Sequence, residues 1–131
     1  MDTQDVLDRP ARRRPPTVLL VEDEDDQREL VTVYLRRSGC EVISAPSAEA
    51  GLDLIEGVDL DLAVVDLRLP GMSGWTLSSA LHERDPRCPI VVTSVLDLES
   101  YPPAHTALPK PFSIGQLRTA LGRLLPHWSP T

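Results

Sequence analysis

The feature that most constrains this fold is an alternation of short apolar runs with longer amphipathic segments. The apolar runs are rich in β-branched residues, which is typical of strands buried on both faces. We predict strands at residues 17–21, 41–45, 60–65, 90–93 and 104–108. Apolar residues recur with a helical period in the other segments. We predict helices at residues 24–38, 47–55 and 75–84, and a last helix that is capped by Ser113.

Strands that alternate with helices predict a parallel sheet, because each parallel connection needs a crossover. The chain has 131 residues, too few for two domains that each bury a core. We therefore expect one doubly wound α/β domain at residues 17–125, preceded by a disordered arm rich in Arg and Pro at 1–16 and followed by a C-terminal tail at 126–131. The arginines of the arm belong either to a solvated tail or to a weak anchor for an acidic surface.

Charge and hydropathy exclude several classes of partner. The chain carries 13 Lys and Arg against 20 Asp and Glu, a net charge of −7. A negative field disfavours nucleic acid and anionic membranes as partners. No apolar run approaches the roughly 18 residues of a membrane helix, and no signal-peptide core follows the acidic start. These features predict a cytoplasmic protein.

Acidic side chains follow two of the predicted strands at the point where each strand ends. Glu22 and Asp23 follow the first strand, and Asp66 follows the third. In open α/β sheets ligands bind beyond these carboxyl ends. Carboxylates that converge repel one another and need a cation, and oxygen ligands favour Mg²⁺. Ser94 and Lys110 follow the fourth and fifth strands, so a hydroxyl and an ammonium group are expected beside the acids.

This set of groups predicts phosphoryl chemistry. A carboxylate can accept a phosphoryl group as an aspartyl phosphate, and Lys110 and Ser94 can bind the new phosphoryl oxygens. Plainer interpretations exist for each position. Acids at residues 22–26 also complement the dipole of the following helix, but that reading does not explain Asp66 at the end of an apolar strand. Ser94 can be a turn hydroxyl, and Lys110 a surface lysine.

Three motifs stand at residues 18–24, 64–74 and 110–112, and they read Val-Leu-Leu-Val-Glu-Asp-Glu, Val-Val-Asp-Leu-Arg-Leu-Pro-Gly-Met-Ser-Gly and Lys-Pro-Phe. With these motifs in this order, residues 17–125 resemble the response-regulator receiver domains of two-component signalling, particularly stand-alone regulators of the chemotaxis type. The resemblance implies a flavodoxin-like, five-stranded parallel sheet with strand order 2-1-3-4-5. It also implies a cis peptide bond before Pro111.

The resemblance further implies a role for each site residue. Asp66 matches the phosphoacceptor, and Ser94 and Lys110 match the groups that respond to the new phosphoryl group. Glu22, Asp23 and Asp66 match the metal ligands, together with the backbone carbonyl of Arg68. A sensor histidine kinase or a histidine phosphotransfer protein is the implied donor in a reaction that needs Mg²⁺. Such a protein is no enzyme in the usual sense, because it catalyses only its own phosphorylation and dephosphorylation.

The chain departs from the family pattern between Ser94 and Lys110, where only 15 residues lie. Two adjacent prolines in this segment prevent a continuous helix. We expect the family's fourth helix to be missing or reduced to about one turn near residues 97–101. Ala107 stands where the family has its switch aromatic, so the usual coupling from hydroxyl to ring is expected to be absent or rerouted.

Two other functions compete with a phosphoacceptor. A degenerate receiver would act as a phosphorylation-independent protein-binding module, and the shortened segment favours that interpretation. A phosphatase with an aspartate nucleophile needs a second aspartate two residues after the first. Arg68 stands at that position, so the sequence disfavours this alternative. Only 21 residues follow Lys110, so we expect a stand-alone regulator that signals to an unknown target through protein contacts.

The two cysteines provide a check on this fold. Cys40 precedes the second strand and Cys88 precedes the fourth. In the family's strand order these strands lie three spacings apart, about 14 Å. A disulfide needs Cα atoms within about 7 Å. We therefore expect two free thiols.

Overall fold

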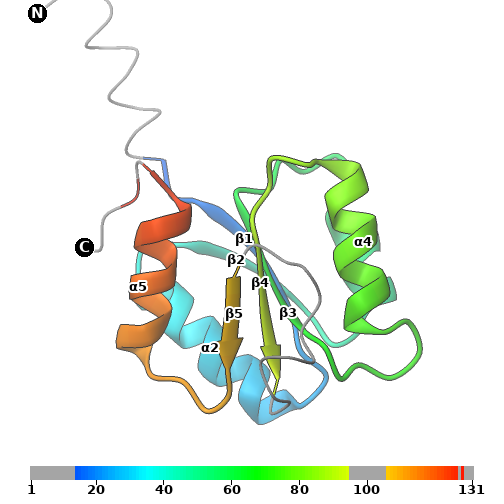
Figure 1. Ribbon diagram of the computed structural model, residues 1–131, viewed down its shortest axis with the longest axis horizontal. Helices are drawn as coiled ribbons and strands as arrows, with labels where there is room; N and C mark the ends of the chain where they lie inside the picture. Colours follow the sequence, from blue (N-terminus) through cyan, green and yellow to red (C-terminus); the bar gives the residue numbers. More distant parts are fainter. Residues whose placement is uncertain (1–13, 95–105, 127, 129–131) are drawn as a thin grey trace, which may run out of the picture.

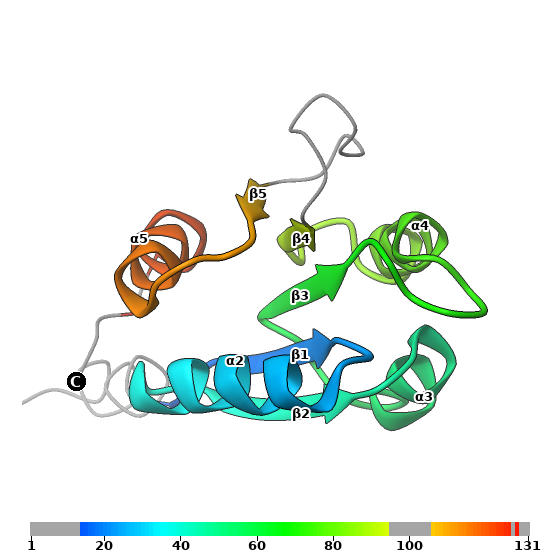
Figure 2. The same ribbon diagram turned by 90° about the horizontal axis from the view of Figure 1, so that it is seen from below.

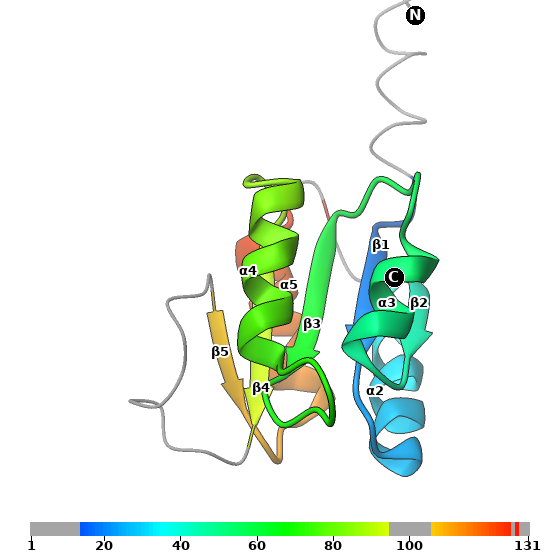
Figure 3. The same cartoon turned by 90° about the vertical axis from the view of Figure 1, so that its right-hand side faces the viewer.

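The computed structural model describes residues 14–94, 106–126 and 128. Its strands are β1 (Thr17–Val21), β2 (Glu41–Ala45), β3 (Leu62–Asp66), β4 (Ile90–Ser94) and β5 (Thr106–Pro109). They form one sheet in the order β2-β1-β3-β4-β5, and every neighbouring pair is parallel. Figure 3 shows the strand arrowheads pointing toward the same end of the sheet. The predicted fold class and strand order are confirmed.

Helices cover both faces of this sheet. They are α2 (Asp25–Arg37), α3 (Ala48–Leu54), α4 (Gly74–Arg84) and α5 (Ile114–Leu124). Helices α2 and α5 lie on one face, and α3 and α4 lie on the other (Figures 1 and 2). Ser47, Ser73 and Ser113 cap α3, α4 and α5, because each side chain accepts a hydrogen bond from a backbone N–H of the first turn.

The core is divided by the sheet into two layers of buried side chains. Leu19 and Val21 of β1 pack in the layer that contains Leu77 of α4, whereas Val18 and Leu20 pack in the layer on the opposite face, against α2 and α5. Successive residues of a strand point to opposite faces. Burial on both faces therefore explains why the strand sequences are continuously apolar rather than alternating.

The strand boundaries differ in detail from those expected. β3 begins at Leu62 rather than at residue 60. The side chain of Asp61, just before it, accepts a hydrogen bond from Thr17 N–H at 2.8 Å. β3 extends through Asp66, which pairs with Thr93. β5 runs from Thr106 to Pro109, and residues 104–105 of the expected strand lie outside the described residues.

The expected loss of a helix near residues 97–101 lies outside the described residues and stays a prediction. The helix capped by Ser113 is present as α5, the fourth helix of the part of the chain that the structure describes. Within that same part, no helix is both long enough and apolar enough to cross a bilayer.

The two ends of the domain are tied to the sheet and to α2. The carbonyl of Pro16 accepts a hydrogen bond from Glu41 N–H at 2.9 Å, so pairing begins one residue before the expected domain boundary. Trp128 donates from its indole Nε1 to the carbonyl of Ser38 at 2.8 Å. Residues 1–13 and most of the expected tail lie outside the described residues.

Cys40 and Cys88 are both buried and both free. Burial raises the pKa of each thiol to about 11, with a smaller contribution from nearby carboxylates such as Asp61. The prediction of two free thiols is confirmed.

Candidate functional site

The carboxyl ends of the strands bring the expected site residues to one edge of the sheet. Glu22 directly follows β1, Asp66 is the last residue of β3, and Ser94 is the last residue of β4. Lys110 directly follows β5, and its backbone N–H donates to the carbonyl of Ser94 at 2.9 Å. The parallel register therefore places residues from four strands beside one another.

Three carboxylates form the acidic part of the site. Oxygen atoms of Glu22, Asp23 and Asp66 lie within 4.8 Å of one another. Glu22 and Asp66 are buried, whereas Asp23 is exposed to solvent. A cluster that offers only carboxylate oxygens, with one member open to water, fits a hard divalent cation such as Mg²⁺ that keeps part of its hydration shell.

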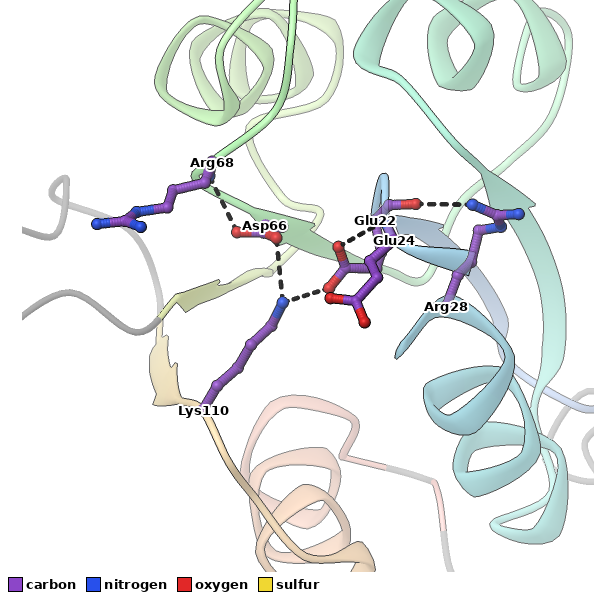
Figure 4. Close-up of polar contacts among 6 residues, drawn as sticks. All are labelled: Glu22, Glu24, Arg28, Asp66, Arg68 and Lys110. Atoms are coloured by element: carbon purple, nitrogen blue, oxygen red, sulfur yellow. Dashed lines mark hydrogen bonds and ion pairs between the residues drawn. The ribbon is translucent and has the colours of Figure 1, made fainter. Parts of the chain in front are cut away.

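Lys110 joins the two buried acids. Its Nζ donates to Asp66 Oδ2 at 3.0 Å and also pairs with Glu22 Oε1 (Figure 4). The lysine side chain is only 15% exposed. Two buried carboxylates without a counter-charge would be costly. The single ammonium group therefore compensates both acids when no metal is bound.

The pKa values of this cluster reflect burial and charge together. Burial raises the pKa of Glu22, and the nearby Asp66 charge raises it further; hydrogen bonds from Lys110 and from Glu24 N–H oppose the shift. Burial alone would lower the pKa of Lys110. Its hydrogen bonds to Glu22 and Asp66, with the charges of both acids, outweigh burial and raise that pKa above its ordinary value. The lysine therefore stays protonated at neutral pH.

The carboxylate of Asp66 is held at both oxygens. Oδ1 accepts a hydrogen bond from the backbone N–H of Arg68 at 2.9 Å, while Oδ2 accepts from Lys110. The side chain of Arg68 is exposed, and Figure 4 shows its guanidinium directed away from the acids. The structure thus brings the backbone of Arg68 to Asp66 through its N–H and leaves its side chain outside the site. The metal-ligand role expected for the backbone carbonyl of Arg68 stays a prediction.

Gly74 determines how closely α4 approaches β3. A Cβ at this position would lie 2.2 Å from the carbonyl oxygen of Asp66 and 2.6 Å from Cα of Leu67. Real Cβ atoms do not approach other atoms so closely, so only glycine permits this contact. The last glycine of the second motif is therefore required by the close packing of α4 on the end of β3.

Ser94 and Ala107 belong to β4 and β5, the two strands next to Asp66 on the side away from β1. Ser94 is 1% exposed, so it is no surface hydroxyl. Ala107 of β5 is partly buried against the core layer under α3 and α4. At the position where the resemblance implies a switch aromatic, the structure therefore has a small side chain that packs on the core.

The sequence interpretation missed one residue that contacts the acidic loop. Arg28 lies one turn into α2 and donates from Nη1 to the backbone carbonyl of Glu22 at 3.1 Å. Its place six residues after the first acid carries no signal by itself, because the contact is with backbone rather than with a side chain.

The fold and this cluster agree with comparisons to known proteins. Residues 18–122 match the family model of the response regulator receiver domain. The chain therefore belongs to the response-regulator receiver family of two-component signalling. The autoinducer 1 sensor kinase/phosphatase LuxN of Vibrio campbellii is 33% identical over 116 residues, which are 84% of this chain and 14% of LuxN. A cyclic di-GMP phosphodiesterase of Thermotoga maritima is 42% identical over 81 residues, 62% of this chain and 22% of that protein.

Solved structures of similar length share the fold. The chemotaxis protein CheY4 of Vibrio cholerae superposes with a TM-score of 0.78 at 26% identity, over 85% of this chain and 99% of CheY4. The response regulator TrrA of Thermotoga maritima, solved in complex with Mg(2+)-BeF, gives a TM-score of 0.75 at 26% identity, over 84% of this chain and 99% of TrrA. The chain spans less than a quarter of the length of LuxN or of the phosphodiesterase.

Proposed function

We propose that this receiver domain accepts a phosphoryl group on Asp66 from the phosphohistidine of a sensor histidine kinase or histidine phosphotransfer protein, in a reaction that requires Mg²⁺. The observation that carries the proposal is the shared contact of Lys110 with Glu22 and Asp66 beside the exposed Asp23. LuxN, a sensor kinase by name, contains a segment similar to this chain.

The donor set supports the proposed cation. Glu22, Asp23 and Asp66 would hold Mg²⁺, with the backbone carbonyl of Arg68 as a further proposed ligand. TrrA, which shares this fold, was solved with Mg(2+)-BeF. When bound, Mg²⁺ would neutralise charge on the phosphoryl group during transfer.

The proposed reaction is a simple displacement. An oxygen of Asp66 forms a bond to phosphorus while the bond from phosphorus to the histidine nitrogen breaks. That nitrogen keeps the electron pair and takes up a proton. Lys110 already lies 3.0 Å from Asp66 Oδ2, so it can move to a phosphoryl oxygen by a charge-assisted hydrogen bond. Ser94 is the proposed hydroxyl partner, and the new charge biases the surrounding surface between two states.

Several finer expectations accompany this proposal. The domain would catalyse only its own phosphorylation and dephosphorylation, and it would signal through contacts with a protein target that is not identified. Four further expectations stay predictions: the stand-alone action of the domain, its cytoplasmic location, its boundaries at residues 17–125, and its lack of nucleic-acid or membrane partners. The assembled acids and Lys110 argue against the phosphorylation-independent binding module.

Treatment with a small acyl phosphate and Mg²⁺, followed by intact mass measurement, tests the proposal. Wild-type protein should gain the mass of one phosphoryl group, and a chelator should prevent the gain. Asp66→Asn should gain none, whereas the exposed control Asp59→Asn should behave as wild type. The proposal fails if wild type stays unmodified or if Asp66→Asn is modified equally.

A further inference from the structure

Arg28 attaches the first turn of α2 to the loop that carries the acidic pair. Its guanidinium Nη1 donates to the carbonyl of Glu22 at 3.1 Å, and its backbone N–H donates to the carbonyl of Glu24 at 2.9 Å. Figure 4 shows the guanidinium on the side of Glu22 that faces away from Lys110. The bond from Nη1 takes the backbone carbonyl of Glu22 as its acceptor, so Arg28 does not occupy the carboxylate of Glu22.

Of the side-chain contacts of Arg28, the hydrogen bond to the Glu22 carbonyl is the one that can fix the loop. Arg28 also pairs with Asp25 at 2.6 Å, but the Asp25 side chain is 86% exposed, and such surface pairs contribute little. The Arg28 side chain is only 22% exposed, and its bond to Glu22 is partly buried. A charge-assisted bond in this setting holds its acceptor firmly.

The held carbonyl belongs to the peptide that joins the two acids. A peptide unit is planar, so fixing the carbonyl oxygen of Glu22 also fixes the direction in which the chain continues to Asp23. The opposite side of Glu22 is fixed as well: its backbone N–H donates to the carbonyl of Ala45 at 3.1 Å, and its Oε2 accepts from Glu24 N–H at 3.2 Å. Arg28 completes this set of restraints.

We propose that Arg28 is a positioning residue for the metal-binding acids: by holding the Glu22 carbonyl, it directs the carboxylates of Glu22 and Asp23 toward one divalent cation. The inference rests on the function proposed above for this edge of the sheet. Arg28 touches neither the phosphoryl group nor the cation and acts only through the loop.

The direction in which cation affinity changes when Arg28 is replaced separates a positioning role from a purely electrostatic one. Arg28 is a positive charge near an acidic site, so its removal should strengthen cation binding if charge alone mattered. If Arg28 positions the acids, its removal should weaken cation binding. Replacement of outer partners of metal ligands typically costs about tenfold or more in affinity.

The experiment compares Arg28→Gln and Arg28→Lys with Arg36→Gln. Arg36 is an exposed arginine about two turns further along α2, so its replacement removes the same charge without the carbonyl contact. Titration calorimetry with Mg²⁺ on the unphosphorylated chain should show about tenfold weaker binding for Arg28→Gln. Arg36→Gln should bind nearly as wild type, and Arg28→Lys should fall between, because lysine can still donate one hydrogen bond.

Hydrogen exchange of the metal-free proteins gives a second readout that is independent of Mg²⁺. The amides of residues 22–25 should exchange faster in Arg28→Gln than in wild type. In Arg36→Gln their exchange rates should equal those of wild type. Unchanged exchange together with equal or tighter Mg²⁺ binding in Arg28→Gln would overturn the inference while leaving the proposed function intact. If wild type binds no Mg²⁺, the proposed function fails, and the exchange data alone decide whether Arg28 holds the loop.

Discussion

At the scale of single residues, the site depends on a lysine that two buried carboxylates share. Lys110 forms ion pairs with Glu22 and Asp66, so it would compete with the proposed divalent cation for the same acids. Lys110 would therefore act at two stages of the proposed reaction. Its ammonium group would neutralise the acids before the cation binds, and it would bind a phosphoryl oxygen after transfer.

Replacing Lys110 tests that competition. Lys110→Met should bind Mg²⁺ more tightly, by at least about tenfold, because a unit charge at contact distance is worth more than ~1.4 kcal/mol at an effective dielectric constant near 20. Calorimetric titration measures the change, and Lys110→Arg, which keeps the charge, should stay close to wild type. Unchanged or weaker binding in Lys110→Met would show that the ammonium group does not compete with the cation.

The buried thiols give a second residue-scale prediction. Burial raises the pKa of Cys40 and Cys88 to about 11. The thiolate, which is the reactive form, is therefore scarcer at neutral pH than in an exposed cysteine. A thiol-specific reagent should label neither cysteine in the native protein and both in denaturant. Rapid labelling of the native protein would contradict the observed burial.

Sequence reasoning succeeded for residues whose position along a strand determines their place. Glu22, Asp66 and Lys110 could be placed because the ends of parallel strands converge at one edge. It failed for Arg28 and for the exact role of Gly74, because both act through contacts with backbone atoms of other elements. Such contacts depend on how a helix approaches a strand, which a pattern of residue types does not encode.

At the scale of elements, the connection between β3 and α4 controls the position of Asp66, the proposed acceptor. The backbone N–H of Gly74 donates to the carbonyl of Leu67 at 3.3 Å, so the start of α4 rests directly on the end of β3. The segment between these two points carries Arg68, whose N–H holds Asp66. Any displacement of α4 should therefore move the carboxylate of Asp66.

Gly74→Ala should displace α4. The added methyl group would overlap the Asp66 carbonyl at 2.2 Å, and overpacking of this kind costs about 1–3 kcal/mol. Urea unfolding should show that loss, and phosphorylation by an acyl phosphate should slow. The matched control is Gly122→Ala in α5, where a Cβ would meet only Trp128 at 3.9 Å; alanine in a helix interior should be neutral or stabilising. Equal stability of the two variants would contradict the close contact.

The periodicity of apolar residues predicted which segments are strands and which are helices. The exact ends of these elements depend on hydrogen bonds between neighbouring segments. β3 begins two residues later than expected, and the residue before it, Asp61, bonds to Thr17 through its side chain. The end of β3 extended to Asp66 because pairing with β4 continues to Thr93. A residue that follows an apolar run can belong to the strand or to the loop, and only its hydrogen bonds decide.

At the scale of the whole molecule, a bound cation should add to stability. The chain carries a net charge of −7, and three of its carboxylates lie together at one edge. A ligand that binds only the folded state stabilises that state by mass action, by about 2.7 kcal/mol at a concentration one hundred times Kd. If the site binds Mg²⁺ as proposed, metal binding would therefore be coupled to folding.

Mg²⁺ should raise the melting temperature of wild type, and a chelator should reverse the gain. Asp23→Asn should lose most of this effect, because the exposed acid is one of three proposed ligands. Sodium chloride at matched ionic strength controls for screening of the net charge. An equal gain with sodium chloride, or an equal gain in Asp23→Asn, would show that Mg²⁺ acts by screening rather than at the site.

The parallel sheet with helices on both faces could be predicted because alternating strands and helices permit few arrangements. The order of its strands was implied only by the resemblance to receiver domains. The motifs then placed the chain in a family, and the family model matches residues 18–122. The identity of a partner could not be reached in this way, since it depends on the chemistry of a second surface.

The central claim is that Asp66 receives the phosphoryl group. Borohydride reduces an aspartyl phosphate to homoserine, so peptide mapping of the wild-type chain after treatment with an acyl phosphate and Mg²⁺ locates the modified residue directly. We predict conversion of Asp66 to homoserine, dependent on Mg²⁺, with Glu22 and Asp23 unchanged. Reduction at another acid, or at none, would contradict the account.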